Sequence, residues 1–322
     1  MLLTGATGFV GPHAVDAFTR AGASVRALVR SPARAAGLGD AEIVQGSLED
    51  DEALARACSG IDVVVHMAAL THARTDAEYH AVNAAGTARL LDAALGADPA
   101  PRRLVYLSSL AACGPAVDGR GVTAGDLPRP LTAYGRSKLE GERVVLAASD
   151  RIETVIVRAP AVYGPRDTDL FHFFRLARWG FIPVPTGADR PLQLVHVEDL
   201  ARGLVHAATA ARATDVYHVA EARSYTWQEV GSLVGAAVGR KRVRVARVPA
   251  PLLSALAAVS ETAAGLVGRS SIFNRDKARE LLAPGWLCET DAARADLEYE
   301  AAIPLADGLR STAQWYRENG WL

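Results

Sequence analysis

The sequence is poor in cysteine and lysine and has no excess of either charge, and these shortages exclude several classes of protein. Its three cysteines, Cys58, Cys113 and Cys288, lie far apart and form no CxxC pair. We therefore expect neither a disulfide framework nor a cysteine zinc cluster, and a reducing cytoplasm is the better match. Because 35 basic residues face 36 acidic ones, a nucleic-acid partner is not expected. The eight histidines show no metal-ligand spacing, so no metal is expected either.

A long uninterrupted apolar run is also missing. The longest apolar stretch, Pro249–Val267, is interrupted by a Ser-Glu-Thr triplet at 260–262, which makes it too broken to predict a membrane span. A helix under a lid and a helix on a membrane surface both stay open for this stretch. No secretory signal is expected, because a glycine-rich turn already begins at Gly5. Half of the residues are apolar and 22% are charged, which is a globular composition.

Short apolar runs alternate with helical segments through the first half of the chain. The expected buried strands are Ser24–Val29, Ile61–His66, Arg103–Leu107 and Thr154–Val157, and the expected helices are Pro12–Ala21, Asp50–Cys58, Ala77–Ala94 and Ala133–Ala147. This alternation predicts an α/β fold with a doubly wound parallel sheet. Only three residues precede the glycine turn, so the first strand is either a stub or begins upstream.

The alternation of expected strands and helices ends after Arg158. Five prolines between Pro160 and Pro191 predict loops around one short helix. A strand over Leu192–Val195 and a helix over Glu198–Thr209 are expected to return to the sheet, followed by a strand over Val216–Val219. The chain is expected to be helical from residue 222 onward. We therefore predict one unit from 1–158 and 192–220, and a smaller, mostly helical C-terminal unit from 159–191 and 221–322.

The turn Thr4–Gly11 follows a strand and opens a helix, which is the geometry that a dinucleotide needs. Gly5 permits the tight turn, Gly8 lets the backbone approach the pyrophosphate, and Gly11 lets the helix pack against the strand. The free N–H groups of the helix N-terminus then face the phosphates. A purely structural turn is the alternative, but the position at strand one of an alternating chain favours cofactor binding.

The second strand ends in arginine instead of an acidic residue. An acidic side chain there would accept the ribose hydroxyls of NAD, whereas the chain has Arg30, with Arg34 nearby. A guanidinium binds a 2′-phosphate through charge-assisted hydrogen bonds. Arg30 therefore favours NADP. Two alternatives stay open: the cofactor is NAD, or Arg30 is a solvated surface residue with no role in cofactor binding.

Tyr134 and Lys138 lie four residues apart at the start of an expected helix, which places them on one face. A cation about 5 Å away would favour the phenolate by about two pKa units, so a lowered Tyr134 pKa is expected. Tyr134 would then exchange a proton with an alcohol or carbonyl oxygen. Ser109, at the end of the preceding strand, is placed to hold that oxygen.

Together these features resemble the extended short-chain dehydrogenase/reductase family, the NAD-dependent epimerase/dehydratase superfamily. The matching segments occur in family order: Thr4–Gly11, Val65–Ala69, Asn83, Ser108–Ser109, Tyr134 with Lys138, Arg158–Pro165 and Leu194–Leu200. The resemblance implies a catalytic triad of Ser109, Tyr134 and Lys138, with Asn83 in a proton relay. It further implies a dinucleotide-binding Rossmann domain, a substrate-binding C-terminal domain, and a homodimer packed through the helices around Asn83–Leu95 and Ala133–Ala147.

The resemblance also assigns binding residues. The expected cofactor contacts are Gly5, Thr7, Gly8, Phe9, Val10, Gly11, Arg30, Ser47, Leu48, His66, Ala68, Ala69, Leu107, Tyr134, Lys138, Pro160 and Val162. The expected substrate contacts are Thr71, Ser109, Tyr163, Phe171 and Phe174. The chain departs from the family pattern in two places, since many members carry Asp after the third strand, where this chain has Gly46-Ser47-Leu48, and Tyr where it has Cys113.

The branch of the family is indicated by what the chain lacks. Nucleotide-sugar epimerases and dehydratases often have Asn and Arg where this chain has Ala161 and Leu192. The chain resembles more closely the 3β-hydroxysteroid dehydrogenase and dihydroflavonol-reductase-like branch, which acts on hydrophobic small molecules. We therefore expect an NAD(P)-dependent oxidoreductase for a secondary alcohol or ketone. A nucleotide-sugar epimerase or dehydratase with recycled NAD, and a non-catalytic nucleotide-binding subunit, stay open.

Four of the seven phenylalanines, at 171, 173, 174 and 181, lie near Trp179. An apolar substrate pocket would use such residues, and an ordinary helix-packing core is an equally good interpretation. His172, within the same run, is expected at an exposed or core-edge position instead of on the substrate.

Overall fold

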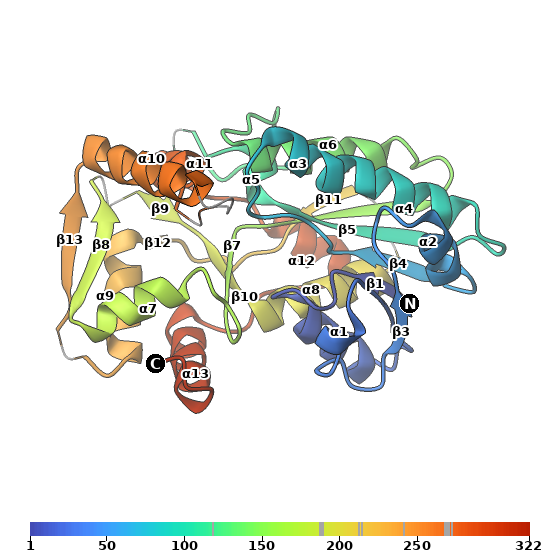
Figure 1. Cartoon of the computed structure of the whole chain (residues 1–322), viewed down its shortest axis with the longest axis horizontal. Helices are drawn as coiled ribbons and strands as arrows, with labels where there is room; N and C mark the ends of the chain where they lie inside the picture. The colour runs from blue at the N-terminus through green and yellow to red at the C-terminus, as the bar shows by residue number, and fades with distance from the viewer. Residues whose placement is uncertain are drawn as a thin grey trace.

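The computed structural model describes residues 1–117, 119–186, 190–211, 213, 215–240, 242–266, 271 and 273–322. At its centre is a seven-stranded sheet in the order β11-β6-β5-β4-β1-β2-β3, in which every neighbouring pair is parallel. Figure 1 shows this sheet in the right half of the molecule, which confirms the predicted doubly wound α/β fold. Its strands are β1 (Leu2–Thr4), β2 (Arg26–Val29), β3 (Glu42–Gln45), β4 (Val63–His66), β5 (Arg103–Ser109), β6 (Glu153–Ala159) and β11 (Asp215–His218).

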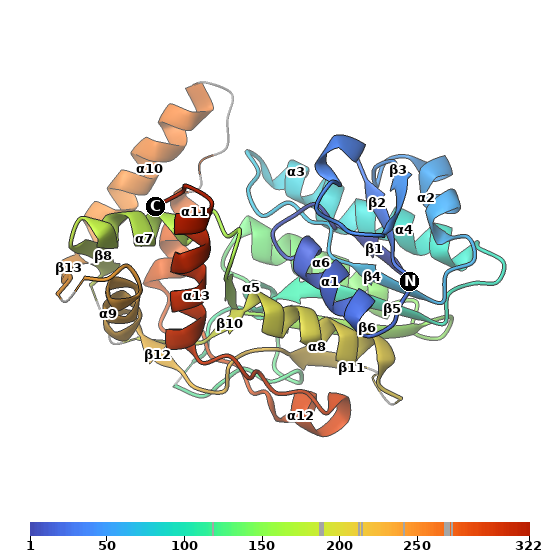
Figure 2. The same ribbon diagram turned by 90° about the horizontal axis from the view of Figure 1, so that it is seen from below.

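The continuous apolar runs arise because both faces of the sheet are covered. Successive side chains of a strand point to opposite faces, so Val65 of β4 joins one core cluster and Val64 joins another. The first cluster includes residues of α1 (Gly11–Arg20) and α8 (Val197–Thr209); Figure 2 shows these two helices next to each other. The second includes residues of α2 (Asp51–Cys58), α4 (Gly86–Leu95) and α6 (Ala133–Leu146).

The helix expected over Ala77–Ala94 is divided into three parts. The chain forms α3 (Asp76–His80), a π-helical segment η2 (Ala81–Ala85) and then α4. Two hydroxyl groups donate to the Asn83 carbonyl oxygen inside this segment, from Thr87 at 2.8 Å and Tyr106 at 3.3 Å. Turns of π-helix are frequent at functional sites. A 3-10 turn, η1 (Pro32–Arg34), and a short helix, α5 (Leu110–Cys113), were also not expected.

The second lobe, on the left in Figure 1, contains helices and three small two-stranded sheets. Its core joins residues of the helices that pack at this end of the molecule with the strands between them. The helices are α7 (Phe171–Arg178), α9 (Trp227–Ala237), α10 (Ala250–Leu266), α11 (Arg275–Leu282) and α13 (Leu305–Glu318), whereas α12 (Asp291–Leu297) packs against α8 and against β11 of the central sheet. The strand pairs are β7 (Ala161–Tyr163) with β10 (Leu194–His196), β9 (Pro191–Leu192) with β12 (Tyr225–Thr226), and β8 (Phe181–Pro185) with β13 (Arg244–Val248).

Three expectations for this lobe are corrected. The predicted strand Leu192–Val195 is two strands, β9 and β10, and neither joins the central sheet. The chain after residue 222 is not purely helical, since it includes β12 and β13. The proline-rich stretch forms β8 instead of a loop. Pro183 and Pro185 are two residues apart, so both turn their missing N–H toward the edge that β13 leaves unpaired.

The longest apolar stretch forms α10, and its last residue, Val267, lies outside the described residues. Leu252, Leu256, Val259 and Leu266 of this helix are exposed. In the part of the chain that the structure describes, no helix has both the length and the apolar character to cross a membrane. A contact between α10 and a membrane surface stays a prediction.

Candidate active site

A cleft of about 730 Å³ lies at the carboxyl ends of the central strands. Its walls come from the loops after β1, β2, β4 and β5, from the start of α6, and from α11 of the second lobe. From β1 the chain first builds β2 and β3 on one side and then crosses back to place β4 on the other side of β1. Open parallel sheets bind their ligands at the point where the strand order reverses in this way.

The glycine turn has the close approaches that its sequence predicts. Gly5 has a φ of +75°, and a Cβ at this position would lie 2.7 Å from the Ala68 backbone nitrogen. A Cβ on Gly11 would lie 2.1 Å from the carbonyl oxygen of Ala6. The Gly8 N–H donates to the Gly5 oxygen at 3.0 Å and closes the turn. No other residue fits these positions without a backbone shift, and the free N–H groups of α1 make the turn suitable for a pyrophosphate.

The far end of this cofactor region carries two arginines. Arg30, which follows β2, and Arg34 both line the cleft together with Ser47. The structure also explains why the neighbouring position is glycine. A Cβ on Gly46 would lie 2.2 Å from the Cβ of Ala53 on α2, so a side chain at this position requires the neighbouring helix to shift.

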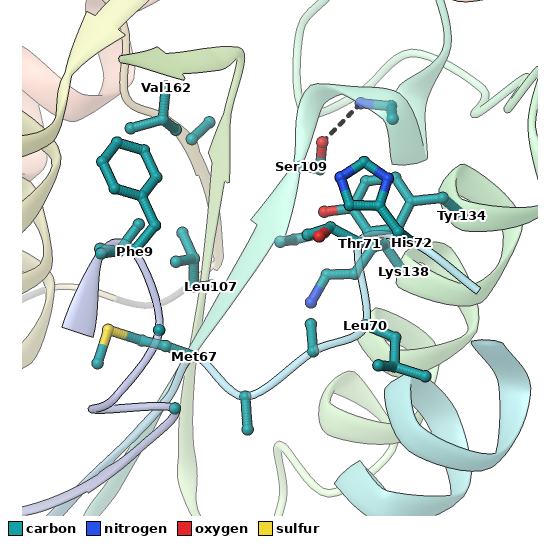
Figure 3. Close-up of a pocket in the computed structure, with 18 of the residues that line it drawn as sticks. Phe9, Met67, Leu70, Thr71, His72, Leu107, Ser109, Tyr134, Lys138 and Val162 are labelled. Carbon is teal, nitrogen blue, oxygen red and sulfur yellow. Dashed lines mark hydrogen bonds between the residues drawn. The ribbon is translucent and has the colours of Figure 1, made fainter. Parts of the chain in front are cut away.

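Most of the predicted cofactor residues line this one cleft. In Figure 3, Phe9, Leu107 and Val162 lie on one side of the pocket, and Ser109, Tyr134 and Lys138 lie on the other. The predicted residues that line it are Gly5, Thr7, Gly8, Phe9, Val10, Gly11, Arg30, Ser47, Leu48, Ala68, Ala69, Thr71, Leu107, Ser109, Tyr134, Lys138, Pro160 and Val162.

His66 is an exception, because it lies behind the cleft. Its side chain is fully buried, and its ring joins the hydroxyl oxygens of Thr4, at 2.6 Å from Nδ1, and Thr87, at 3.0 Å from Nε2. Burial, helped by the charge of Lys138, lowers the pKa of His66 to about 3. The expected cofactor contact is therefore corrected to a structural role that ties β1 and β4 to α4.

The proposed triad residues come from two neighbouring elements. Ser109 ends β5, and Tyr134 and Lys138 lie in the first two turns of α6. The start of α6 is fixed by Thr132, whose hydroxyl oxygen accepts from the Gly135 N–H at 3.1 Å. Ser109 hydrogen-bonds the Tyr134 hydroxyl, and its own oxygen accepts from the Ala111 N–H at 3.1 Å.

The electrostatic balance at Tyr134 differs from the sequence expectation. Burial raises the pKa of Tyr134, and the hydrogen bond from Ser109 offsets only part of this effect. The Lys138 ammonium lies 4.0 Å from the centre of the Tyr106 ring, and burial lowers its pKa to about 7. The predicted lowering of the Tyr134 pKa is thus wrong for this structure, because removal from water outweighs the neighbouring groups.

The adjacent Ser108 has a different environment from Ser109. Its hydroxyl donates to the Glu142 carboxylate at 2.5 Å, and Arg158 donates two hydrogen bonds to the same carboxylate at 2.9 and 2.7 Å. Ser108, Glu142 and Arg158 are all buried. The sequence analysis did not single out Glu142, whose position on α6 gives no local signal of a partner 16 residues away.

Asn83 does not line the cleft, but it supports the segments that form the wall of the cleft. The side chain is fully buried, accepts from the Leu70 N–H at 2.8 Å and donates to the Leu70 oxygen at 2.9 Å. It also donates to the Ser137 hydroxyl at 2.9 Å, which in turn donates to the Tyr134 carbonyl oxygen at 2.8 Å. Asn83 therefore holds the loop after β4 against α6, close to the backbone of Tyr134.

Three of the expected substrate residues lie in the core of the second lobe instead of on the cleft. Tyr163 and Phe174 are fully buried. The Phe171 ring centre lies 5.1 Å from that of Tyr316 and 5.4 Å from that of Trp321. Phe171, Phe173 and Phe174 therefore join a packing core, the alternative raised above, whereas Phe181 is exposed and Trp179 is 83% exposed.

The substrate end of the cleft is built mainly from residues that the sequence analysis did not identify. Beyond Thr71, its lining comes from four separate parts of the chain. These residues include His72, Tyr79, Asp167, Asp169, Leu192, Gln193, Asp276, Lys277, Glu280, Leu281 and Trp286. No spacing in the sequence could have grouped them, because they meet only when the second lobe packs against the central sheet.

Comparison with known proteins agrees with this architecture. The model of the "NAD dependent epimerase/dehydratase family" matches residues 1–220. A ceramide reductase of Caulobacter vibrioides is 34% identical over 325 residues, covering 99% of this chain and 95% of that protein. A 4-hydroxy-2-methyl-3-oxo-4-farnesyl-3,4-dihydroquinoline-1-oxide ketoreductase of Stigmatella aurantiaca is 33% identical over 309 residues, covering 87% of this chain and 90% of that protein.

Solved structures show the same fold. The structure of MoeE5 in complex with UDP-glucuronic acid and NAD matches with a TM-score of 0.78 and 25% identity, and the match covers 99% of each chain. The expected resemblance is thereby confirmed. The chain belongs to the NAD dependent epimerase/dehydratase family, and it is an enzyme, a dehydrogenase or reductase of the extended short-chain type.

Proposed function

We propose that the enzyme reduces a ketone, or oxidises the matching secondary alcohol, on a largely hydrophobic substrate, with NADP as the preferred cofactor. The observation that carries this proposal is the convergence of Ser109, Tyr134 and Lys138 on the cleft that also contains the glycine turn. A binding module would not need all three of these side chains.

Each member of the triad has a specific role in the reduction. Bound reduced nicotinamide supplies the hydride. Tyr134 donates its hydroxyl proton to the carbonyl oxygen, and Ser109 donates a hydrogen bond to the same oxygen. The Tyr134 hydroxyl carries its proton at neutral pH, as an ordinary tyrosine does, so it has a proton to give in the reductive direction; burial raises its pKa and the proton must therefore pass to the oxygen as the hydride arrives. Lys138, one turn further along α6, is the residue we expect to bind the nicotinamide ribose.

The preference for NADP rests on the two arginines at the other end of the cleft. Arg30 and Arg34 both line this end, together with the Ser47 hydroxyl. Two guanidinium groups favour the 2′-phosphate of NADP, which carries negative charge that the ribose hydroxyls of NAD lack.

The hydrophobic character of the substrate rests on the lining and on the relatives. Leu110, Leu192, Leu281 and Trp286 supply apolar surface at the substrate end. The two relatives described above are named as reductases of a ceramide and of a farnesyl-bearing quinoline oxide. A long-chain or polycyclic ketone is therefore a better match than an anionic nucleotide sugar.

Nicotinamide absorbance of the purified protein tests the proposal. The protein is offered NADPH or NADH with long-chain and steroid ketones, and separately NAD⁺ with nucleotide sugars. Loss of reduced cofactor with the ketones, faster with NADPH, is the expected result. Conversion of nucleotide sugars without net change in the cofactor would support an epimerase instead. Stoichiometric NADPH binding without turnover on any substrate would indicate a non-catalytic subunit.

A further inference from the structure

His72 and Asp169 meet across the substrate end of the cleft. His72 lies in the loop after β4, Asp169 lies just before α7 of the second lobe, and both line the cleft. The His72 Nε2 atom is 3.2 Å from one Asp169 carboxylate oxygen and 3.4 Å from the other. Burial alone would raise the pKa of Asp169, but the hydrogen bond from His72 and the positive charge nearby, including that of Lys277, outweigh it and hold that pKa below its ordinary value.

The pair is close to the proposed triad. The Tyr79 hydroxyl donates to the carbonyl oxygen of Thr71, the residue before His72, at 3.2 Å. The ring centre of Tyr79 lies 6.0 Å from that of Tyr134. Figure 3 shows the His72 ring in the pocket, on the side where Ser109 and Tyr134 lie. His72 is therefore placed to touch a substrate whose carbonyl group is held by Tyr134.

The partner of His72 decides which of its ring nitrogens carries the proton. An ionised carboxylate can only accept hydrogen bonds, so Nε2 must be the donor toward Asp169. In the neutral form of the imidazole this is the single proton, and Nδ1 is then an acceptor. Within the described ranges, no side chain or backbone group donates to this nitrogen. A substrate group that bonds to Nδ1 must then be a donor.

On the basis of the proposed reductase function, we propose that the substrate carries a hydroxyl or amide N–H group next to its reacting carbonyl, and that Nδ1 of His72 accepts a hydrogen bond from it. His72 is thus a specificity-determining residue that orients the carbonyl toward Tyr134. Phosphate and carboxylate groups are disfavoured here, since an ionised anion has no proton to donate. Asp167, Asp169, Asp276 and Glu280 also line the substrate end, where Lys277 is the one lysine among the described residues that line that end.

A matched pair of long-chain ketones tests the inference. One carries a hydroxyl on the carbon next to the carbonyl, and the other carries the methyl ether of that hydroxyl, which keeps the oxygen but cannot donate. The wild-type enzyme is expected to favour the hydroxy ketone by about three- to ten-fold in kcat/KM, mostly through KM, because one neutral hydrogen bond contributes about that factor.

Two substitutions should remove this preference by different routes. In His72→Gln the amide can still donate to Asp169, but the Nδ1 acceptor is gone, so the kcat/KM ratio of the two ketones should fall to about one. In Asp169→Asn the new amide can donate to Nε2, which moves the proton to Nδ1. This variant should also lose the preference, and it should gain activity on the methyl ether.

The control is a second histidine–carboxylate pair outside the cleft. His80 and Glu140 are 2.6 Å apart, and the His80 side chain is 62% exposed. His80→Gln should leave the ratio unchanged, and NADPH titration should show that all three variants retain the cofactor site.

The outcomes separate this inference from the proposed function. A preference for the hydroxy ketone that persists in His72→Gln overturns the inference while ketone reduction stands, because steric rejection of the ether would not depend on His72. A wild-type enzyme that does not distinguish the two ketones overturns it as well. A wild-type enzyme that binds NADPH and reduces neither ketone counts against the proposed function, and the inference falls with it.

Discussion

The two ends of the cleft are built in different ways. The cofactor end is formed by one continuous turn, 4–11, and by the loops at the ends of neighbouring strands, where the backbone makes the close approaches. The substrate end is formed by side chains from distant parts of the chain, such as the pair of His72 and Asp169 and the residues of α11. Tyr134 and Lys138 lie where the two ends meet.

This difference explains which contacts a sequence can reveal. A backbone turn needs glycine at fixed spacings, and such spacings are visible in the chain itself. A contact between side chains 97 residues apart, as at His72 and Asp169, leaves no spacing to recognise. We therefore expect substitutions at the cofactor end to act on folding and nucleotide binding, and substitutions at the substrate end to act on substrate selection.

The largest effect is expected at the junction, from Tyr134→Phe. This change removes the proton donor and leaves the ring in place, so kcat should fall by about 10²- to 10⁴-fold. NADPH affinity, measured by fluorescence titration, should change little. Tyr79→Phe is the matched control, because this tyrosine also lines the cleft but bonds the Thr71 carbonyl oxygen. Equal loss in both variants, or retained turnover in Tyr134→Phe, would remove Tyr134 from the mechanism.

The next largest effect concerns stability at low pH. Burial lowers the pKa of His66 to about 3, whereas the unfolded chain has the ordinary value near 6.5. The unfolded state therefore binds a proton that the folded state does not, and stability is lost as the pH falls below about 6.5. The cost is about 3 kcal/mol at pH 4.5, from about 1.4 kcal/mol per pH unit.

Urea unfolding between pH 7.5 and 4.5 measures this slope. His218, whose pKa burial lowers to about 4, should contribute in the same direction. His66→Gln should flatten the slope, because it removes the buried group that takes up a proton only on unfolding. An unchanged slope in His66→Gln would show that this histidine does not titrate as a buried group.

A somewhat smaller effect is expected at the adenosine end. Arg30→Ala removes a charge-assisted pair with the 2′-phosphate, so NADPH binding should weaken by about 1.5–3 kcal/mol, or roughly 10- to 150-fold. NADH binding should change far less. The measurement is the dissociation constant of each nucleotide. If both weaken equally, Arg30 does not discriminate between them, and the NADP preference loses its main support.

A backbone test compares two helical glycines. Gly11→Ala places a Cβ 2.1 Å from the Ala6 oxygen, whereas the Cβ in Gly265→Ala meets no atom within 4 Å. The first change should cost about 1–3 kcal/mol of stability through overpacking and should weaken binding of both nucleotides. The second should be neutral or slightly stabilising, because alanine favours helix more than glycine. Thermal unfolding with and without NADPH distinguishes the two outcomes.

The smallest effect is expected for His172→Gln. His172 is exposed on α7 and does not line the cleft, so the change in stability should stay within about 0.5 kcal/mol. Activity on every accepted ketone should match the wild type. A substantial loss of activity would show that the substrate reaches beyond the cleft toward α7.

Several elements were predicted correctly because their signals are local. The strands β4, β5 and β6 and the helices α1, α2 and α6 lie within about two residues of their predicted bounds. Tyr134 and Lys138 share one face of α6, so a spacing of four was enough to place both on the cleft. The division of the helix around Asn83 was not predictable, because its carbonyl oxygen bonds Tyr106 on a separate strand.

The aromatic residues show the limit most clearly. Tyr163, Phe171 and Phe174 were expected on the substrate, yet they pack against residues such as Tyr316 near the end of the chain. An apolar side chain suits a core and a pocket equally well, and only the arrangement of the surrounding helices distinguishes them.

The sequence by itself determined the alternating α/β architecture, the glycine turn and the placement of Tyr134 and Lys138 on one helical face. These features depend on residues that are near each other in the chain. The tertiary structure alone decided that burial raises the pKa of Tyr134, that His66 lies behind the cleft, and that His72 faces Asp169. Burial and pairing depend on which distant segments pack together, and no short stretch of sequence carries that information.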